Sequence, residues 1–499
     1  MKKALEIIPF FLLTIPLFLA LHIEKEYRNL IQYEFVSREI IQLFAASFII
    51  ATFIFLFVRN FRVACVYALP VIMIFYFFAD LKDHLHEWNS TSFVSSYRFL
   101  LPAAVVFLLV IFWVIRTSKS HFKRFFLFVN LTFLIFIIYE IAAIAIGSTA
   151  GKKDEPNNQS FHAASYQACD SCVHPDIYYI VFDAYTSSKV LSSEFNYDNS
   201  PIDSFLQMKG FYLVRNSRSN YNLTPFSIGA TFNAEYLRSL NTNKDFYLDQ
   251  YLPGISFVRK NQLFSMLRQE GYQVINHSIF NFNELPSTIA PFDLWELKLI
   301  YERHNIFKKV NKDIGWTLWP SIYHRKAGSN DLRKYAVERD RFFTNSLNDL
   351  RSTIKTKTSL PKFTYAHLLL PHGPYTYDST GNKITYEPKR TTLEESKKGY
   401  INQLAYTNKV IKTIVEEIFL YTDKPLVVIL QGDHGFKYND PAKKDLEFSN
   451  LNAMYFYNRD YKLLNDTLSN INTFRVIFNS FFKKNYPLLK DTSYFLQYR

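Results

Sequence analysis

The chain has little cysteine, no cluster of positive charge and no internal repeat. Only 3 of its 499 residues are cysteines. Cys169 and Cys172 lie neither at a predicted helix start nor in a β-α-β context, which argues against a thioredoxin-like redox site and leaves a local disulfide or no role. Lys and Arg number 57 against 44 Asp and Glu, but they are spread along the chain. Nucleic acid is therefore disfavoured as a partner, and anionic lipid or a phosphate-bearing substrate is favoured.

Polar side chains are scarce in five long apolar segments at the amino-terminal end of the chain. Each segment approaches the ~20 residues that cross ~30 Å of hydrocarbon, so we expect a bundle of five membrane-spanning helices within residues 1–146. The scarcity of polar groups argues against a transporter or a channel. A signal peptide is the alternative for the first segment, but no small-residue cleavage site follows it. The segments are 5–21, 40–58, 63–78, 100–115 and 125–146.

Positive charge in the short loops predicts the orientation of these spans. Lys and Arg dominate the amino terminus and the second and fourth loops, whereas the first and third loops mix acids with bases. Loops rich in Lys and Arg face the cytoplasm, so the chain from residue 147 onward is expected outside it. Glu140 falls within the fifth segment, where a carboxylate is costly. Two roles stay open for it: contact with a lipid head group, or a paired or protonated position near the outer interface.

The rest of the chain has the pattern of a linker and one α/β domain. Residues 147–174 are polar without an apolar period and are expected to form the linker. Residues 175–499 are long enough for one sizeable core, and helical and strand patterns alternate along them. This alternation predicts a mixed, largely parallel sheet flanked by helices. The clearest helices are expected at 261–271, 332–354 and 396–419.

Residues that can bind a metal follow three predicted strands. Asp183 follows one β-branched and aromatic run, and Asp433 with His434 follows another. His372 lies in a loop after a third run, which contains His367. Because ligands gather at the carboxyl ends of parallel strands, we expect these side chains near one edge of the sheet.

Simpler explanations exist for several of these residues. Asp183 could cap the turn that follows it, and His367 could be a buried core histidine with its hydrogen bonds satisfied. Thr224, which precedes Pro225, could open a helix whose free N–H groups hold an anion, or it could be that helix's N-cap. Thr186 is a competing candidate for a nucleophile because it also follows a strand.

In this order the segments resemble the sulfatase-like branch of the alkaline phosphatase superfamily. Its membrane members include the lipoteichoic acid synthase and phosphoethanolamine transferase families. The resemblance covers most of residues 174–490 and is specific only in the combination of its motifs. These are an acidic residue after the first strand, a threonine 41 residues later, a His-Gly-Pro loop and a late Asp-His pair: Asp183, Thr224, His372 and Asp433-His434.

The resemblance implies one divalent metal held by Asp183, Thr224, Asp433 and His434. It also implies that His372 contacts the substrate phosphate and assists catalysis, and His367 is a further candidate for substrate binding. Oxygen and nitrogen ligands without a thiolate suit Zn²⁺ or Mn²⁺, with Mg²⁺ as a further option. A threonine hydroxyl is a weak nucleophile at neutral pH, and a bound metal would stabilise its alkoxide.

The reaction expected from this resemblance is phosphoryl transfer. Formylglycine sulfatases need Cys or Ser followed by Pro and Arg at fixed spacing, and residues 215–232 contain no such pattern. We therefore expect a metal-dependent phosphotransferase in the bacterial cytoplasmic (inner) membrane, with its catalytic domain facing the periplasm or exterior. It would move a phosphoethanolamine- or phosphoglycerol-type head group from a membrane phospholipid donor to a glycan or lipid acceptor of the cell envelope, through phospho-Thr224. The alternatives are a sulfatase-like or phosphodiester hydrolase and a catalytically silent envelope scaffold.

Overall fold

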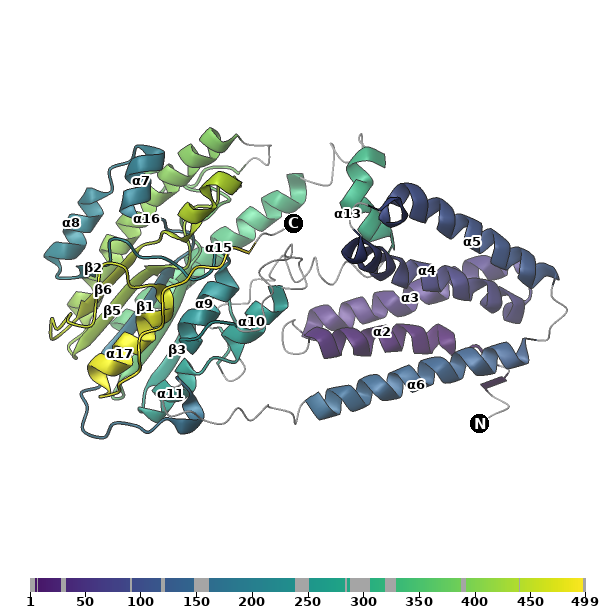
Figure 1. Ribbon diagram of the computed structural model, residues 1–499, viewed down its shortest axis with the longest axis horizontal. Helices are drawn as coiled ribbons and strands as arrows, with labels where there is room; N and C mark the ends of the chain where they lie inside the picture. Colours follow the sequence, from purple (N-terminus) through teal and green to yellow (C-terminus); the bar gives the residue numbers. More distant parts are fainter. Residues whose placement is uncertain are drawn as a thin grey trace. The chain divides into compact units, whose positions relative to one another are not determined.

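The computed structural model describes residues 5–6, 8–27, 33–89, 92–117, 122–147, 161–237, 251–282, 285–287, 306–318, 329–386, 392–438 and 440–496. The chain divides into two compact units (Figure 1). The helical unit comprises residues 1–154 and 294–324, and the sheet unit comprises residues 155–293 and 325–499. Residues 294–324 thus group with the amino-terminal helices although they interrupt the sheet unit in sequence.

Long apolar helices form most of the helical unit. Four of its helices, α3 to α6, are long and apolar enough to cross a membrane, judged by length and composition. The first predicted span corresponds to α2, which has 17 residues and begins at Phe11, so a count of five spans stays a prediction. The helices are α2 (Phe11–Tyr27), α3 (Tyr33–Val58), α4 (Phe61–Trp88), the 3-10 turn η1 (Phe93–Ser95), α5 (Tyr97–Thr117), α6 (Lys123–Gly147) and α13 (Ile306–Leu318).

Helix α4 continues well beyond its apolar part. The prediction placed Asp80, Lys82 and Asp83 in a loop after a span at 63–78, and this is wrong because all three lie within α4. No glycine or proline interrupts residues 79–88, so nothing in the local sequence ends the helix there. The last turns of α4 therefore carry charged side chains on a regular helical frame.

Glu140 of α6 is buried and paired with α2. Its carboxylate oxygens lie 2.9 Å from His22 Nδ1 and 2.8 Å from Lys25 Nζ. A carboxylate inside an apolar bundle is tolerated when a cation neutralises it. The structure thus agrees with the paired position, one of the two roles predicted for this residue.

One six-stranded sheet, with the order β2-β6-β5-β1-β4-β3, is the centre of the sheet unit. Strands β5, β1, β4 and β3 run parallel, whereas β6 is antiparallel to both of its neighbours. This is the mixed, largely parallel sheet that the sequence predicts. The strands are β1 (Asp176–Phe182), β2 (Tyr212–Leu213), β3 (Gln273–His277), β4 (Lys362–Leu368), β5 (Leu426–Gly432) and β6 (Asn452–Phe456).

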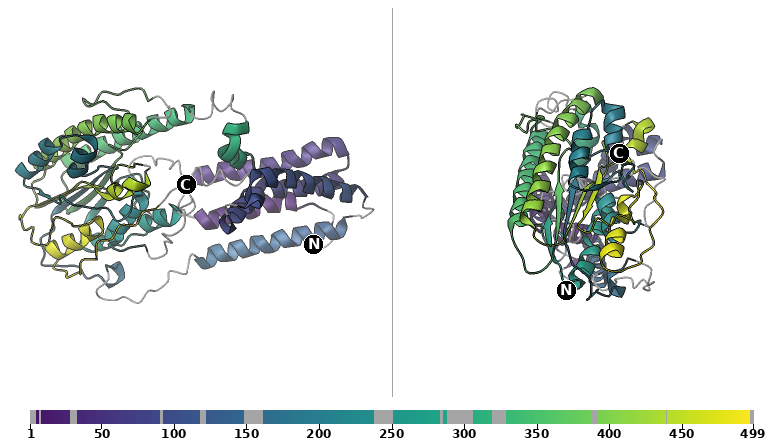
Figure 2. Two further views of the ribbon diagram at one scale, coloured as in Figure 1. Left: turned by 45° about the horizontal axis from the view of Figure 1, so that its top comes forward. Right: turned by 90° about the vertical axis from the view of Figure 1, so that its left-hand side faces the viewer.

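Helices cover both faces of this sheet (Figure 2). Alternate residues of a strand point to opposite faces. Tyr178 and Ile180 of β1 therefore pack in the core with α7 (Ser188–Phe195), α8 (Ser200–Met208), α15 (Ser329–Lys355) and α16 (Leu393–Tyr421). On the other face Tyr179 contacts Phe232 and Phe474, from α9 (Thr224–Asn233) and α17 (Thr473–Phe481). Helices α10 (Tyr251–Arg259) and α11 (Leu263–Gln269) lie on the same side as α9.

The three helices predicted most clearly are present. Helix α11 lies within 261–271 and ends before Gly271, whose φ of +81° suits glycine, and β3 follows as expected. Helices α15 and α16 contain the predicted ranges 332–354 and 396–419. Thr392 and Glu395 form a capping box that fixes the start of α16. Short 3-10 turns complete the unit: η2 (Ala163–Ser165), η5 (Pro441–Phe448) and η6 (Asn470–Asn472).

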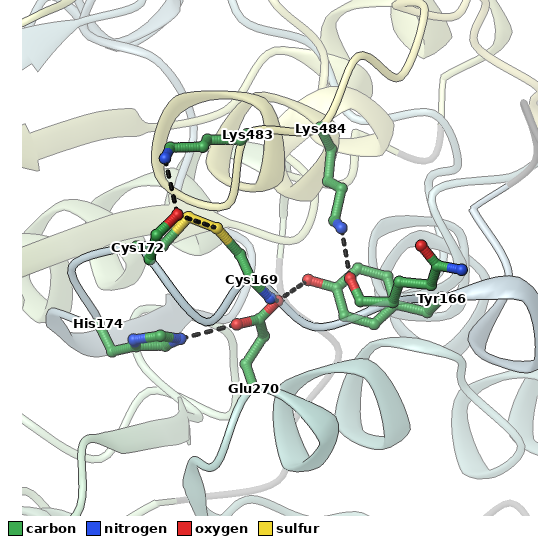
Figure 3. Close-up of a disulfide and its surroundings, with 9 residues drawn as sticks. Tyr166, Cys169, Cys172, His174, Glu270, Lys483 and Lys484 are labelled. Carbon is green, nitrogen blue, oxygen red and sulfur yellow. Dashed lines mark hydrogen bonds and ion pairs between the residues drawn. A yellow bond between two sulfur atoms is a disulfide. The ribbon is translucent and has the colours of Figure 1, made fainter.

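Cys169 and Cys172 form a disulfide in the segment that leads into β1 (Figure 3). Glu270, at the end of α11, binds this segment at three points. Its carboxylate accepts hydrogen bonds from the Tyr166 hydroxyl and from the Cys169 backbone N–H at 3.0 Å, and it lies 2.7 Å from His174 Nε2. The disulfide is thus a local staple, one of the two outcomes predicted, in a segment that Glu270 fixes to the sheet unit.

Candidate metal centre and active site

The strand register brings two predicted metal ligands to the same level of the sheet. Strand β1 pairs with β5 up to Phe182 and Gly432. Asp183 and Asp433 are each the first residue after this last pair, so they leave the sheet side by side. The carboxyl edge of a parallel sheet is the usual place for ligands in such folds.

Three side-chain atoms converge at this edge: Asp183 Oδ1, Asp433 Oδ2 and His434 Nε2. The histidine nitrogen lies 3.8 Å from Asp183 Oδ1 and 3.6 Å from Asp433 Oδ2. All three residues are buried, and none of these atoms has a hydrogen-bond partner among the described residues. In the described part of the chain they form the one group of three potential ligands of this kind, with atoms within 4.8 Å of one another.

Hydrogen bonds to the loop backbone orient the side chains of Asp433 and His434. Asp433 Oδ1 accepts 2.9 Å bonds from the N–H groups of Ala184 and His434, which leaves Oδ2 for the centre. His434 Nδ1 lies 2.8 Å from the carbonyl oxygen of Gly435. Because a carbonyl can only accept, Nδ1 carries the proton and Nε2 presents its lone pair, as in a metal-binding histidine.

The tight loop after β5 requires glycine. A Cβ atom on Gly435 would lie 2.5 Å from the carbonyl oxygen of Ser449. The Asp-His-Gly sequence therefore combines two ligand side chains with a residue that lets the backbone of the next segment approach.

A divalent cation fits this arrangement. The gaps of 3.6 and 3.8 Å are too long for hydrogen bonds, so no shared proton links His434 to the two acids. Buried carboxylates without a compensating cation cost several kcal/mol. Two carboxylate oxygens and one imidazole nitrogen form a donor set that Zn²⁺ and Mn²⁺ accept.

Arg339 of α15 compensates one of the two acids, and the sequence reasoning missed it. Its Nη2 donates to Asp183 Oδ2 at 3.2 Å and to the Leu369 carbonyl at 3.1 Å. Burial alone would raise the pKa of the Asp183 carboxyl, but neighbouring His372 and Arg339 outweigh burial and hold this pKa well below its usual range. Since burial lowers the pKa of His372 to about 4, that imidazole is neutral near pH 7 and the guanidinium is the effective cation.

Thr224 is the first residue of α9. The N-cap of α9 is Leu223, so the prediction of Thr224 as N-cap is wrong, whereas the expected helix start is present. One turn later, Ser227 Oγ donates a 2.5 Å hydrogen bond to the Asp433 carbonyl oxygen. This bond ties the first turn of α9 to the ligand loop. Coordination of a metal by Thr224 stays a prediction.

The competing nucleophile, Thr186, is already engaged in the fold. Its hydroxyl donates to the Ser449 carbonyl at 3.0 Å, and its N–H donates to the Tyr400 hydroxyl at 3.0 Å. The residue is fully buried. These bonds give Thr186 a structural role at the edge of the sheet.

The His372 loop lies next to the ligand group. The His372 N–H donates to the Asp183 carbonyl at 3.1 Å, and the rings of His372 and His434 are 6.2 Å apart. Gln403 of α16 braces the loop by donating to the carbonyls of Pro371 at 3.1 Å and His372 at 2.9 Å. Because His372 Nδ1 lies 2.6 Å from the Gly373 carbonyl, the proton sits on Nδ1 and Nε2 carries the lone pair of the neutral ring.

His367 lies within β4 and is fully buried. Its Nδ1 is 3.0 Å from the Tyr365 hydroxyl, whereas Nε2 has no hydrogen-bond partner among the described residues. Burial lowers its pKa, so the ring is held neutral. The alternative of a buried histidine with satisfied hydrogen bonds therefore holds for Nδ1 and not for Nε2.

Two supporting residues could have been found from helical spacing. Arg339 lies three or four residues from buried Ala336 and Phe343, and Gln403 lies seven residues from buried Val410. A charged or amide side chain on the apolar stripe of an amphipathic helix is costly unless it has a specific partner. A polar side chain at an apolar position of the helical pattern was therefore the sequence feature that could have identified Arg339 and Gln403.

A family model described as Sulfatase matches residues 194–474, more than half of the 499-residue chain. The chain belongs to the sulfatase family. The match includes Thr224, His367, His372 and the Asp433-His434 pair, whereas Asp183 precedes it. Membership of the sulfatase family places the chain among enzymes of the alkaline phosphatase superfamily, as the resemblance predicted.

Several solved structures are similar to this sulfatase-family chain. One is the integral membrane protein lipooligosaccharide phosphoethanolamine transferase A (EptA) from Neisseria meningitidis, with 13% identity, 95% of both chains covered and a TM-score of 0.37. Another is the C-terminal periplasmic domain of EcEptC from Escherichia coli in complex with Zn, with 13% identity, 66% of this chain and 92% of that chain covered and a TM-score of 0.40. A third is phosphonate monoester hydrolase of Agrobacterium radiobacter, with 12% identity, 61% and 73% covered and a TM-score of 0.39.

These TM-scores lie below 0.5, so the likenesses by themselves decide neither fold nor activity. A comparison with curated proteins finds no match. Within the sulfatase family the chain departs from the formylglycine pattern, because Thr224 and Pro225 open α9 and no Cys or Ser with the required Pro and Arg spacing precedes them.

Proposed function

We propose that this chain is a membrane-anchored, metal-dependent phosphotransferase that moves a phosphoethanolamine- or phosphoglycerol-type head group. The observation that carries the proposal is the convergence of Asp183, Asp433 and His434, with unpartnered ligand atoms, at the sheet edge where the first turn of α9 is fixed to the Asp433 loop. Thr224, at the start of that turn, is the proposed nucleophile and fourth metal ligand.

The proposed reaction has two steps. In the first, Thr224 Oγ1 attacks the phosphorus of a membrane phospholipid, the bond from phosphorus to the diacylglycerol oxygen breaks, and that oxygen takes up the proton that Thr224 loses. In the second, an acceptor hydroxyl attacks phospho-Thr224, the head group passes to the acceptor, and the threonine regains a proton. A bound Zn²⁺ or Mn²⁺ would stabilise the threonine alkoxide and polarise a phosphoryl oxygen.

His372 is suited to carry protons and contact the phosphate in both steps. It is neutral near pH 7, and its Nε2 is free to accept because Nδ1 is engaged with Gly373. Arg339 and Gln403 act through Asp183 and the His372 loop and are positioning residues in this scheme. His367 is proposed as a further substrate contact through its unpartnered Nε2.

The membrane-spanning helices of the helical unit support the proposal of a phospholipid donor. We propose that α2 is a fifth span, so that a chain with a cytoplasmic amino terminus has its sheet unit on the outer side of the bacterial inner membrane, where phospholipid head groups of the outer leaflet lie. The acceptor is a glycan or lipid of the envelope. A hydrolase differs from this scheme only in using water in the second step. A catalytically silent scaffold would be destabilised by buried ligand atoms that have no hydrogen-bond partner and bind no metal.

The test is covalent capture on Thr224. The full-length protein, loaded with Zn²⁺ or Mn²⁺, is incubated in vesicles with phosphatidylethanolamine or phosphatidylglycerol, and mass spectrometry follows the peptide that carries Thr224. We expect a head-group phosphate adduct on Thr224, and a loss of turnover on the order of 10³-fold or more in Thr224→Ala. Release of head group without acceptor transfer would indicate the hydrolase. Full activity in Thr224→Ala would refute the assignment.

A further inference from the structure

Helix α13 joins the helical unit through a charged contact with α4 and α5. Lys309 Nζ lies 2.7 Å from Asp83 Oδ1 of α4. Asp313, one turn later, accepts a 2.6 Å hydrogen bond from the Tyr97 hydroxyl of α5 and lies 3.6 Å from Lys82 Nζ. Figure 1 shows α13 next to α4, and the α4 side chains of this contact belong to the charged last turns of that helix.

The polarity of α13 is inverted relative to a helix on a water-soluble protein. Lys309 is buried, with 6% of its side chain exposed, and faces the unit. Phe307 is 72% exposed. Val310 and Ile314, which helical spacing places on the same outward side as Phe307, are only half-buried, and Asn311 on this side is exposed. A helix in water turns its apolar stripe inward and its charges outward, so the outward side of α13 suits an apolar medium.

The position of Phe307 identifies this medium. Its ring packs against Phe75 of α4, with ring centroids 5.8 Å apart. Phe75 lies in the uncharged part of α4, residues 63–78, within the candidate span Phe61–His86. It precedes Asp83 by eight residues, or about 12 Å along a helix. The helix α13 thus reaches from the charged end of α4 to the level of its apolar side chains.

We infer that α13 is an interfacial membrane helix whose outward side, Phe307, Val310 and Ile314, lies in the lipid of the outer leaflet. Its charged side, Lys309 and Asp313, fixes it to α4 and α5. The chain passes between the two units after residue 154, before residue 294 and after residue 324. The sheet unit is therefore attached to the membrane region through three chain segments. This inference does not depend on the chemistry of the metal centre.

The first experiment measures lipid contact in the full-length protein. Cys65 is replaced by Ala, and the disulfide keeps Cys169 and Cys172 unreactive. A fluorophore is attached at Asn311→Cys, which is exposed on the outward side of α13, or at Lys462→Cys, 88% exposed in the sheet unit. The protein is reconstituted in vesicles of phosphatidylethanolamine and phosphatidylglycerol with brominated or unbrominated acyl chains. We expect bromine to quench the probe at 311 about threefold more than the probe at 462. Equal quenching at both sites would overturn the inference.

The second experiment tests the charged contact with the same readout. Asp83→Lys places a cation beside Lys309 and should reduce quenching at position 311 to the level at 462. The exchange Asp83→Lys with Lys309→Asp should restore part of it, because the pair with position 83 is rebuilt with reversed polarity whereas the 3.5 Å pair of Lys309 with Asp313 is lost. Unchanged quenching in the single variant would show that the pair does not hold α13 in lipid. The probe at 462 and the elution volume of each variant report whether the protein has folded.

Discussion

The two units bury carboxylates in different ways. In the helical unit, Glu140 has Lys25 and His22 within 2.9 Å, so one acid meets one full cation and an imidazole. In the sheet unit, the guanidinium of Arg339 pairs with Asp183, and Asp433 has no Lys or Arg within ion-pair distance among the described residues. Lys25 balances the charge of Glu140, whereas the sheet unit has two buried acids and one guanidinium, and Asp183 Oδ1, Asp433 Oδ2 and His434 Nε2 converge there without hydrogen-bond partners among the described residues. The comparison teaches that an incompletely neutralised buried cluster indicates a bound cation, and a complete one indicates a structural role.

The strongest test of this comparison removes one acid from each cluster. Asp433→Asn should abolish stoichiometric Zn²⁺ or Mn²⁺ binding and lower turnover by about 10³-fold, because several kcal/mol of charge stabilisation are lost. Glu140→Gln is the matched control, and it should retain the metal. Metal content by plasma mass spectrometry and head-group release are the measurements. Equal metal content in Asp433→Asn and Glu140→Gln would contradict the assignment of a metal site to the sheet-unit cluster alone.

A smaller effect is expected when Arg339, the cation paired with Asp183, is replaced. Arg339→Met leaves Asp183 buried without its partner and should destabilise the metal-free sheet unit by about 3 kcal/mol, with partial recovery in Arg339→Lys. Added Zn²⁺ should offset part of this loss, so the metal-induced rise in Tm should be larger in the variant than in the wild type. If Zn²⁺ raised the Tm of the variant and of the wild type equally, Arg339 and the metal would not both neutralise Asp183.

Far-UV circular dichroism follows the unfolding of the sheet unit. Arg339→Met should lower the temperature of the dichroism transition of the metal-free protein, and Arg339→Lys should lower it less.

The smallest effect concerns the pH response of the sheet unit. His277 of β3 is buried against Thr353, and burial lowers its pKa to about 4. The unfolded chain takes up a proton below its ordinary pKa of about 6.5 and the folded chain does not, so this contribution to stability is present above that pH and is lost as pH falls toward 4. The loss is at most about 3 kcal/mol. We expect His277→Gln to flatten the fall in the dichroism Tm between pH 7 and pH 5, and an unaltered slope would contradict the assignment.

Local sequence patterns predicted the elements that carry the site. Continuous β-branched and aromatic runs before Asp183 and Asp433 indicated buried strands, and the structure has them as β1 and β5. The amphipathic stripe at 396–419 indicated α16. These predictions succeeded because periodicity and burial are encoded by residues that are neighbours in sequence.

Long-range partners were harder to predict. Arg339 reaches Asp183 across 156 positions in the sequence. Helical spacing from buried Ala336 and Phe343 indicates that this arginine needs a partner, but no local pattern indicates that the partner is Asp183. In the same way, a segment between two parts of the sheet unit gave no local sign that Lys309 would pair with Asp83.

By itself, the amino-acid sequence determined the apolar helices, the strands and the polar residues that end those strands, because each depends on a local pattern of side chains. Only the tertiary structure decided that Phe182 pairs with Gly432, and hence that Asp183 and Asp433 emerge together. It also decided that one arginine neutralises only part of their charge. Register and charge balance arise from packing between distant segments, and a linear pattern does not contain these distances.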